Sequence, residues 1–295
     1  MEDKKILIVP KITKVEWDLH RLGFTEDKLK EFYKKENLNV ERIFESHKRQ
    51  KENLERIKNL IIGATIVNRD GLNKYIINNY DLIIAVGGDN HFQYVSHFLE
   101  NTPILGINSD PSRSDGALMM VSSEELEKIL PNILRDYFEI ENWTRLKISI
   151  DNKEIDELAI SEIFIGEERR FNMSRNIIKV NGKSEEQKSS GLIIATGVGS
   201  TGWYNSACRY LFQEGDIFSK SLKEARFLLT EPHNGRLSSL KMTNGSIGED
   251  EEIEIISLSD SSAYISIDSL KLIKLREGAK IKISIGEPLR VIRPK

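Results

Sequence analysis

The sequence has little that would direct it to a membrane, to nucleic acid or to an oxidising compartment. Its only cysteine among 295 residues is Cys208, so no disulfide can form within the chain. The 43 Lys and Arg residues nearly balance the 46 Asp and Glu residues, and the net charge is -3. Such a chain has no general attraction for phosphate backbones or anionic membranes. The first apolar run, residues 6–9, is too short for a signal-peptide core or a membrane span. We therefore expect a cytoplasmic location, with no nucleic-acid and no membrane partner.

Several common site patterns are also missing. The five histidines show no metal-ligand spacing and one cysteine cannot build a structural zinc site, so we expect no bound transition metal. The segment Gly182-Lys183-Ser184 is similar to the end of a phosphate-binding Walker A loop, but Ile177 stands where that loop needs its first glycine. Ser200 is not the nucleophile of a hydrolase elbow, because Val198 stands where that turn needs glycine.

The length and the hydrophobic pattern predict two domains, since 295 residues exceed the size at which a single core usually stops growing. In residues 1–140, strand-like runs (5–9, 64–67, 82–86) alternate with helix-like stretches (26–35, 40–61, 72–79). This alternation is typical of an α/β domain, a parallel sheet with flanking helices. Residues 141–295 contain many short alternating runs, which predict a β-rich second domain. We also expect that the C-terminal tail can pack back on the first domain.

A glycine turn between a buried strand and a helix is the most informative segment. The turn is Gly87-Gly88-Asp89-Asn90, and an apolar helical face follows it. Adjacent glycines let the backbone approach an anion, and the first amides of a helix favour negative charge. Asp89 could then accept a proton from an attacking hydroxyl or help to hold Mg²⁺, which is kinase chemistry. On composition alone, a plain turn that caps the helix is the commoner interpretation. We interpret His91 as a partly exposed residue of the first helical turn, outside the catalytic set.

A second segment, residues 189–203, enters a loop rich in glycine and hydroxyls that can line a polyanion. Gly197, Gly199 and Gly202 match the GxGxxG dinucleotide fingerprint, which is weak unless a β-α-β unit follows with an acidic residue about 20 positions on. Here the loop lies in the β-rich half, and no clear strand ends at Glu214 or Asp216. We therefore reject the standard dehydrogenase interpretation.

Taken together, the Gly87-Gly88-Asp89 turn, Glu162 and residues 190–202 resemble the NAD kinase family. Residues 106–116 (GINSDPSRSDG) and 186–192 (EQKSSGL) are similar to signatures of its animal mitochondrial branch, and residues 161–167 (SEIFIGE) are a further match. The resemblance extends from the first strand to about Ser206. After that only the region of Asp268 is similar, and there we interpret Asp268 as a turn residue at the end of a strand.

The resemblance implies transfer of the ATP γ-phosphoryl group to the 2′-hydroxyl of the adenosine ribose of NAD(H), with Mg²⁺ on the donor. Asp89 would activate the hydroxyl, and Glu162 with Ser161 would hydrogen-bond a dinucleotide ribose. The resemblance also implies an α/β N-terminal domain, a β-sandwich C-terminal domain and assembly as a homodimer or homotetramer. The residues it places at the nucleotide are Gly87, Gly88, Asn90, Asn108, Thr196, Gly197, Gly199, Ser200, Thr201 and Ser206.

Two other functions stay open. Asn90 and His91 stand where the family has Gly-Thr, and Ser161 stands where it has Asn. These differences lead to the hypothesis that the chain is a dinucleotide-binding sensor that has lost or redirected catalysis. A lipid or sphingoid-base kinase of the related family shares the Gly-Gly-Asp turn and the two-domain plan, but residues 190–202 resemble the NAD kinases more closely.

Overall fold

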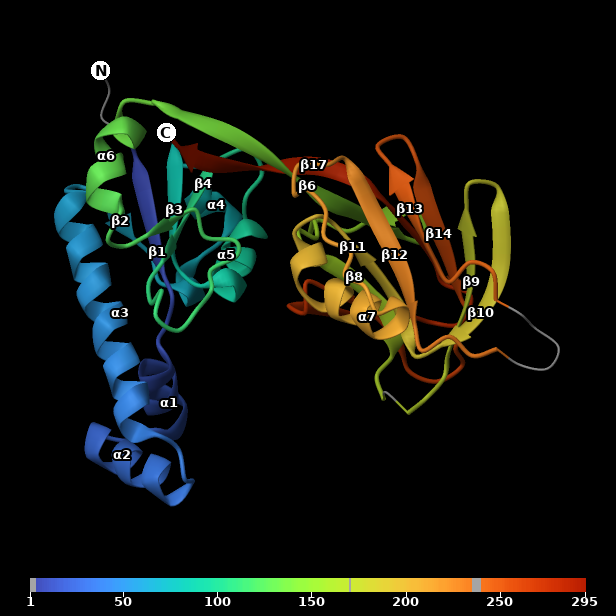
Figure 1. Ribbon diagram of the computed structural model, residues 1–295, viewed down its shortest axis with the longest axis horizontal. Helices are drawn as coiled ribbons and strands as arrows, with labels where there is room; N and C mark the ends of the chain where they lie inside the picture. Colours follow the sequence, from blue (N-terminus) through green and yellow to red (C-terminus); the bar gives the residue numbers. More distant parts are fainter. Residues whose placement is uncertain (1–3, 170, 235–239) are drawn as a thin grey trace. The chain divides into compact units, whose positions relative to one another are not determined.

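The chain forms two units with separate hydrophobic cores in the computed structural model, which describes residues 4–169, 171–234 and 240–295. Unit 1 comprises Met1–Glu141 and Arg290–Lys295, and unit 2 comprises Asn142–Leu289 (Figure 1). The last six residues belong to unit 1 because the end of β17 (Lys280–Pro294) pairs with β4 (Ile104–Asn108) at Val291 and Ile104. In the described ranges, no helix has both the length and the apolar character that a membrane crossing requires.

A parallel sheet forms the centre of unit 1. Its strand order is β2-β1-β3-β4, followed by the end of β17, and short β5 (Val121–Ser122) pairs with β4. Every residue of β1 (Ile6–Pro10), β3 (Leu82–Gly87) and β4 is buried, whereas β2 (Thr65–Ile66) is an exposed edge. Strands covered on both faces are continuously apolar, which explains why the sequence shows apolar runs here instead of alternation.

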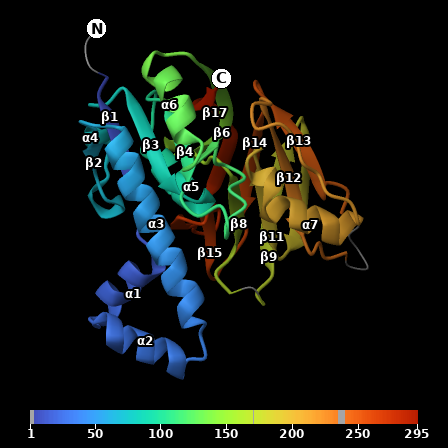
Figure 2. The ribbon, with the colours of Figure 1, turned by 60° about the vertical axis from the view of Figure 1, so that its left-hand side comes forward.

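Helices cover both faces of this sheet. Leu54 and Ile57 of α3 (Val40–Leu60) and Leu130 of α6 (Leu126–Leu134) pack against one face. On the other side, the Phe92 ring of α5 (Asp89–Ser96) lies against Gly106 of β4. Figure 2 shows α3 and α6 over the same face. The helix expected over residues 72–79 is shorter, because only Lys74–Ile77 (α4) is helical and a single turn, η1 (Arg69–Gly71), precedes it.

A small helical cluster adjoins the sheet of unit 1. It consists of α1 (Lys14–Leu22), α2 (Glu26–Lys35) and the first half of α3, packed around Val15, Leu29 and Tyr33. Helix α1 was not predicted from the sequence, although Thr13 and Glu16 form a capping box, a recognised sequence signal for a helix start. This helix follows directly after β1 and therefore lies at the carboxyl end of the sheet.

Unit 2 is a β-sandwich, so the expected fold class is confirmed. One sheet has the order β13-β12-β11-β8-β15-β16, and the other contains β10-β9-β14-β17 with β6 and β7. Ile165 and Leu192 of the first sheet pack against Ile255 and Ile281 of the second. The strands are β6 (Phe138–Ile150), β7 (Lys153–Glu154), β8 (Glu162–Glu167), β9 (Ser174–Val180), β10 (Lys183–Ser189), β11 (Gly191–Ala195), β12 (Glu224–Thr230), β13 (Asn244–Gly248), β14 (Glu252–Ser257), β15 (Ala263–Ile267) and β16 (Lys271–Lys274).

One helix, α7 (Trp203–Phe212), interrupts the β pattern of unit 2. Tyr204 and Cys208 pack against Phe164, Ile193 and Leu228 on the outer face of the six-stranded sheet. A single turn, η2 (Gly199–Thr201), leads into it. This helix was not predicted from the sequence, although Tyr204 and Cys208 have the i, i+4 spacing of one helical face.

Candidate functional site

A cavity of about 860 Å³ opens in unit 1 where the parallel strands end. Because carboxyl ends of parallel strands meet at one edge of a sheet, the segments that follow β1, β2 and β3 converge there. Gly88 and Asp89 come from the predicted turn, with Asn90 in the first turn of α5. The amides at the start of a helix have no partners within it and favour an anion. The residues with charged, turn or amide groups on the wall include Lys11, Lys14, Arg69, Asp70, Gly88, Asp89 and Asn90.

The cations of this cavity were not predicted from the sequence. Lys11 follows β1 directly, Arg69 lies three residues after the end of β2 at position 66, and Lys14 begins α1. Lys14 is paired with Asp18 at 2.7 Å, and the Arg69 guanidinium lies 3.8 Å from the centre of the Tyr94 ring. The available signal was position, since basic residues that end parallel strands gather at the ligand-binding edge. The cavity is therefore polar and basic around the glycine turn.

Gly87 faces the protein interior, while Gly88 faces the cavity. A side chain added at Gly87 would place its Cβ 2.8 Å from the imidazole of His91. The expected partly exposed position of His91 is wrong, because its side chain is buried and its Nε2 lies 2.8 Å from the carbonyl oxygen of Val9. Since a carbonyl only accepts, Nε2 carries the proton and Nδ1 does not. Burial lowers the pKa of His91 to about 4, so the ring is neutral at pH 7.

The buried ring of His91 predicts a loss of stability on mild acidification. The unfolded chain binds a proton on this residue near pH 6.5 and the folded chain only near pH 4, so stability is complete above pH 6.5 and falls below it. This difference in pKa lowers the free energy of unfolding by roughly 3 kcal/mol over the whole pH interval. Urea unfolding between pH 7 and 4.5 should show the decline, and His91→Gln, whose amide still donates to Val9, should flatten it. If the stability of His91→Gln declined as steeply with falling pH, the decline could not be attributed to His91.

Asp89 joins the glycine turn to a neighbouring loop. Its two carboxylate oxygens accept hydrogen bonds from the backbone amides of Ala117 at 3.1 Å and Leu118 at 2.9 Å. Each carboxylate oxygen has two lone pairs, so the group keeps acceptor capacity for a ligand hydroxyl or a metal ion. Asp89 therefore lies at the cavity wall in a fixed position.

Asn108 shapes the same loop from behind the cavity wall. Its side chain is buried, donates to the Ser114 carbonyl at 2.9 Å and accepts from the Asp110 amide at 3.1 Å. Asp110 in turn accepts a hydrogen bond from Arg49 of α3 at 3.1 Å. Ser114 lines the cavity, and its hydroxyl oxygen lies 3.2 Å from where a Cβ on Gly88 would be. Asn108 thus positions Ser114 at the glycine turn.

In unit 2, Ser161 and Glu162 lie where β8 begins, next to the end of β15. The carboxylate of Asp268 accepts hydrogen bonds from the amides of Ile160, Ser161 and Glu162 at 2.8, 2.8 and 3.0 Å. Burial and the nearby charge of Asp268 raise the pKa of Glu162, and a 2.6 Å hydrogen bond from the Ser161 hydroxyl opposes them. A carboxyl group perturbed in this way is a candidate for contact with a ligand. Asp268 holds the backbone of this segment in place.

The loop after β11 is built against the same segment. Thr196 donates from its amide to the Ser161 carbonyl at 2.9 Å and accepts from the Val198 amide at 3.1 Å. A Cβ on Gly199 would lie 2.2 Å from the Ser161 carbonyl oxygen, and one on Gly197 would lie 2.0 Å from the Ser219 carbonyl oxygen. Close packing of the chain on itself therefore requires both glycines.

The hydroxyl groups of this loop divide into internal and exposed ones. Ser200 is fully buried, donates to the Gly197 carbonyl at 2.7 Å and accepts from the Phe218 amide at 3.1 Å. Thr201 and Ser206 are exposed and donate only to carbonyls of their own turn and helix, at 2.9 and 3.2 Å. A ligand would reach Thr201 and Ser206, whereas Thr196 and Ser200 shape the loop.

The predicted site residues thus form one cluster in each unit. Gly88, Asp89 and Asn90 share the cavity of unit 1, with Gly87 and Asn108 behind its wall. The cluster of unit 2 consists of Ser161, Glu162, Thr196, Gly197, Gly199, Ser200, Thr201 and Ser206.

Comparison with known proteins gives one consistent family. No family model matches the chain. A protein named as a probable NADH kinase from Oryza sativa is 26% identical over 242 residues, covering 74% of this chain and 73% of that protein. The mitochondrial NAD kinase 2 of Rattus norvegicus is 25% identical, covering 81% of this chain and 68% of that protein. The crystal structure of an NAD kinase from Archaeoglobus fulgidus in complex with ATP covers 97% of this chain and 92% of its own, with a TM-score of 0.66 and 21% identity.

The structural likeness shows the fold, and the sequence relatives are named as kinases of NAD or NADH. The resemblance that the sequence analysis drew from the glycine turn, Glu162 and residues 190–202 is confirmed, including its link to the mitochondrial type. In sequence and in fold, the chain is thus similar to proteins named as NAD kinases and NADH kinases.

Proposed function

We propose that the chain is an NAD(H) kinase that transfers the γ-phosphoryl group of ATP to the 2′-hydroxyl of the adenosine ribose of NAD(H). The observation that carries this proposal is the Gly88-Asp89-Asn90 segment at the start of α5, which opens onto a cavity lined by Lys11, Lys14 and Arg69. Helix amides and cations together suit a polyphosphate. The names of the sequence relatives agree with this chemistry.

In this proposal, the cavity of unit 1 holds the phosphates of the donor. The backbone at Gly88 and Asn90 lies against them, and Lys11 and Arg69 neutralise their charge. Mg²⁺ fits this set of groups, because it keeps several waters and needs only one or two carboxylates beside the phosphate oxygens. Asp89 and Asp70 supply carboxylates at the cavity, and the metal would lower the charge repulsion between donor and acceptor.

The proposal also gives the residues of each cluster a role of their own toward the acceptor. Asp89 accepts the proton of the attacking hydroxyl, since its carboxylate is held in place by the amides of Ala117 and Leu118. Ser161 and Glu162 hydrogen-bond a ribose of the dinucleotide. Thr201 and Ser206 contact the nucleotide from their exposed positions, while the internal residues Thr196, Gly197, Gly199 and Ser200 hold the loop in shape.

The direct test is to incubate the purified chain with ATP, Mg²⁺ and either NAD or NADH. An NADP-specific dehydrogenase then reports the product. We expect NADP(H) to accumulate only with donor and metal present. Absence of product with both dinucleotides, despite measurable binding of NAD(H), would overturn the kinase proposal and favour the sensor.

The sensor alternative rests on Asn90, His91 and Ser161. The structure places Asn90 in helical conformation at the cavity wall, with no positive φ that would require glycine. Its side chain occupies space at the cavity wall that glycine would leave open, so we expect Asn90→Gly to maintain or raise kcat. Steady-state assays with NAD and NADH check this. A loss of 10-fold or more would show that the Asn90 side chain has its own role at the site.

Assembly as a homodimer or homotetramer is part of the proposal. Sedimentation equilibrium of the purified chain measures it directly, and a monomer at all concentrations would contradict this part without affecting the catalytic one.

A further inference from the structure

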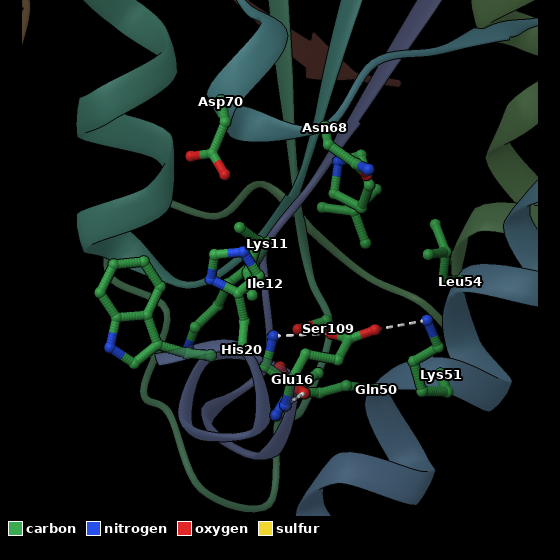
Figure 3. A pocket seen from close by; sticks show the side chains of 14 residues that line it. Lys11, Ile12, Glu16, His20, Gln50, Lys51, Leu54, Asn68, Asp70 and Ser109 are labelled. Carbon is green, nitrogen blue, oxygen red and sulfur yellow. Dashed lines mark hydrogen bonds and ion pairs between the residues drawn. The ribbon is translucent and has the colours of Figure 1, made fainter. Parts of the chain in front are cut away.

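A second cavity of about 510 Å³ lies beside the first one in unit 1. It is walled by α1 on one side and α3 on the other, and it shares Trp17, Asp70 and the residues that follow β1 with the first cavity. Figure 3 shows Asn68 and Asp70 on one side of this space and Glu16, Gln50 and Lys51 on the other. Its volume lies in the range of about 300–1,000 Å³ that small-molecule sites occupy.

The cavity combines an aromatic face with apolar side chains. Trp17 lies on its wall with 53% of its surface exposed, which is unusual for a residue of this size. Leu54 of α3 and Val86 of β3, both buried, also line the space. An indole face with apolar neighbours is a stacking surface for a flat heterocycle.

The charge of this cavity suits a neutral group. Lys51 forms an ion pair of 2.7 Å with Glu16, so the two charges compensate each other within the wall. Lys11 and Asp70 lie on the walls of both cavities and their charges also compensate each other. A phosphate would therefore be held better in the first cavity, which adds Lys14, Arg69 and the start of α5.

The orientation of the Gln50 amide is fixed by a chain of hydrogen bonds. The Ser46 hydroxyl donates its only proton to the carboxylate of Asp110, so its oxygen is left to accept. The Gln50 amide nitrogen is the donor, at 3.1 Å from that oxygen. The carbonyl oxygen of Gln50 is consequently the end that can accept a hydrogen bond from a ligand. The 6-position of adenine carries a donating amino group, whereas that of guanine carries an accepting oxygen.

We propose that the cavity between α1 and α3 holds the purine base of the phosphoryl donor, stacked on Trp17 with its 6-amino group toward the Gln50 carbonyl. The inference rests on the proposed kinase function, because it takes the neighbouring cavity to hold the donor's phosphates. It assigns the preference for adenine over guanine to a single amide whose direction is set by Ser46 and Asp110.

Calorimetric titration of the full chain tests the proposal, with Mg²⁺ and either ATP, GTP or inorganic tripolyphosphate, which has no base. Trp17→Ala should weaken ATP binding about 10-fold or more, the usual size of a lost stacking contact, and leave tripolyphosphate unchanged. Trp17→Phe, which keeps a ring, should retain most of the affinity. Gln50→Met should reduce the preference for ATP over GTP about 10-fold. The matched control is Glu52→Met, an exposed position on the same helix, which should change nothing.

The outcomes separate this inference from the function on which it rests. If the wild-type chain binds neither ATP nor tripolyphosphate, the kinase proposal fails. If ATP binds and Trp17→Ala leaves its affinity unchanged, or if tripolyphosphate loses affinity to the same extent, the base site is overturned while the kinase stands. If Trp17→Ala weakens NAD(H) instead of ATP, the cavity takes the acceptor and the assignment to the donor is wrong.

Discussion

Asp89→Asn is expected to reduce kcat by about 100-fold or more, because the amide cannot accept the proton of the attacking hydroxyl. The side chain has nearly the same shape, so dinucleotide binding should be largely preserved. The structure adds a second effect. The backbone N–H groups of Ala117 and Leu118 both donate to the Asp89 carboxylate. In the variant, the side-chain NH₂ group faces one of these two donors and cannot accept its hydrogen bond. The Ala117 amide is exposed to solvent and can bond to water, so losing its bond costs at most about 1 kcal/mol and thermal unfolding should shift downward only slightly.

Three measurements on the same preparation separate the two roles of Asp89. Turnover, NAD(H) affinity and thermal stability are compared with those of Asp115→Asn, which makes the same charge change at an exposed position of the adjoining loop. We expect the control to match the wild type in all three. Turnover of Asp89→Asn within 10-fold of the wild type would refute the role of Asp89 as proton acceptor. If the variant is less stable but turns over normally, Asp89 only holds the loop at Ala117 and Leu118 in place.

The fold followed from the sequence where hydrophobic periodicity was strong. Buried parallel strands such as β1 and β3 are continuously apolar, and the strands of unit 2 alternate, so both were predictable without a structure. The helices α1 and α7 were missed for a different reason. Few of their apolar residues are buried, namely Val15 in α1 and Tyr204 and Cys208 in α7. These residues pack on other elements, Val15 on Tyr33 of α2 and the α7 pair on Phe164 of β8, so local periodicity alone does not reveal the helices.

The candidate site was predictable as motifs but not as contacts. The turn at Gly88 and Asp89 could be identified from residue types, because only a strand, glycines and a carboxylate in sequence were needed. The partners of Asp89 could not, since Ala117 and Leu118 lie 28 and 29 residues away in sequence. Nor could the burial of His91, which depends on a hydrogen bond to Val9, 82 residues away. Composition contains no information on such distant pairs.

The glycines of residues 197–202 illustrate how a motif can have a structural cause. Their spacing matches a phosphate-binding fingerprint, yet the structure accounts for two of them without any ligand. The position of a Cβ on Gly197 is only 2.0 Å from the Ser219 carbonyl oxygen and 2.7 Å from the Cα of Lys220. Both are backbone atoms, so no side-chain rotation can relieve the overlap. The turn after β11 and the segment before β12 must separate if any side chain is added.

Gly197→Ala is therefore expected to destabilise unit 2 by ~4 kcal/mol or more, among the largest effects of a single substitution. The matched change is Gly202→Ala in the same loop, where the nearest atom to the new Cβ would be the Gly199 carbonyl oxygen at 3.7 Å, an ordinary contact. Urea unfolding of the full chain measures both, and the control should lose far less stability. A Gly197→Ala variant as stable as the control would show that the approach of Ser219 is looser than described. The glycine would then be available to a ligand, as the fingerprint suggests.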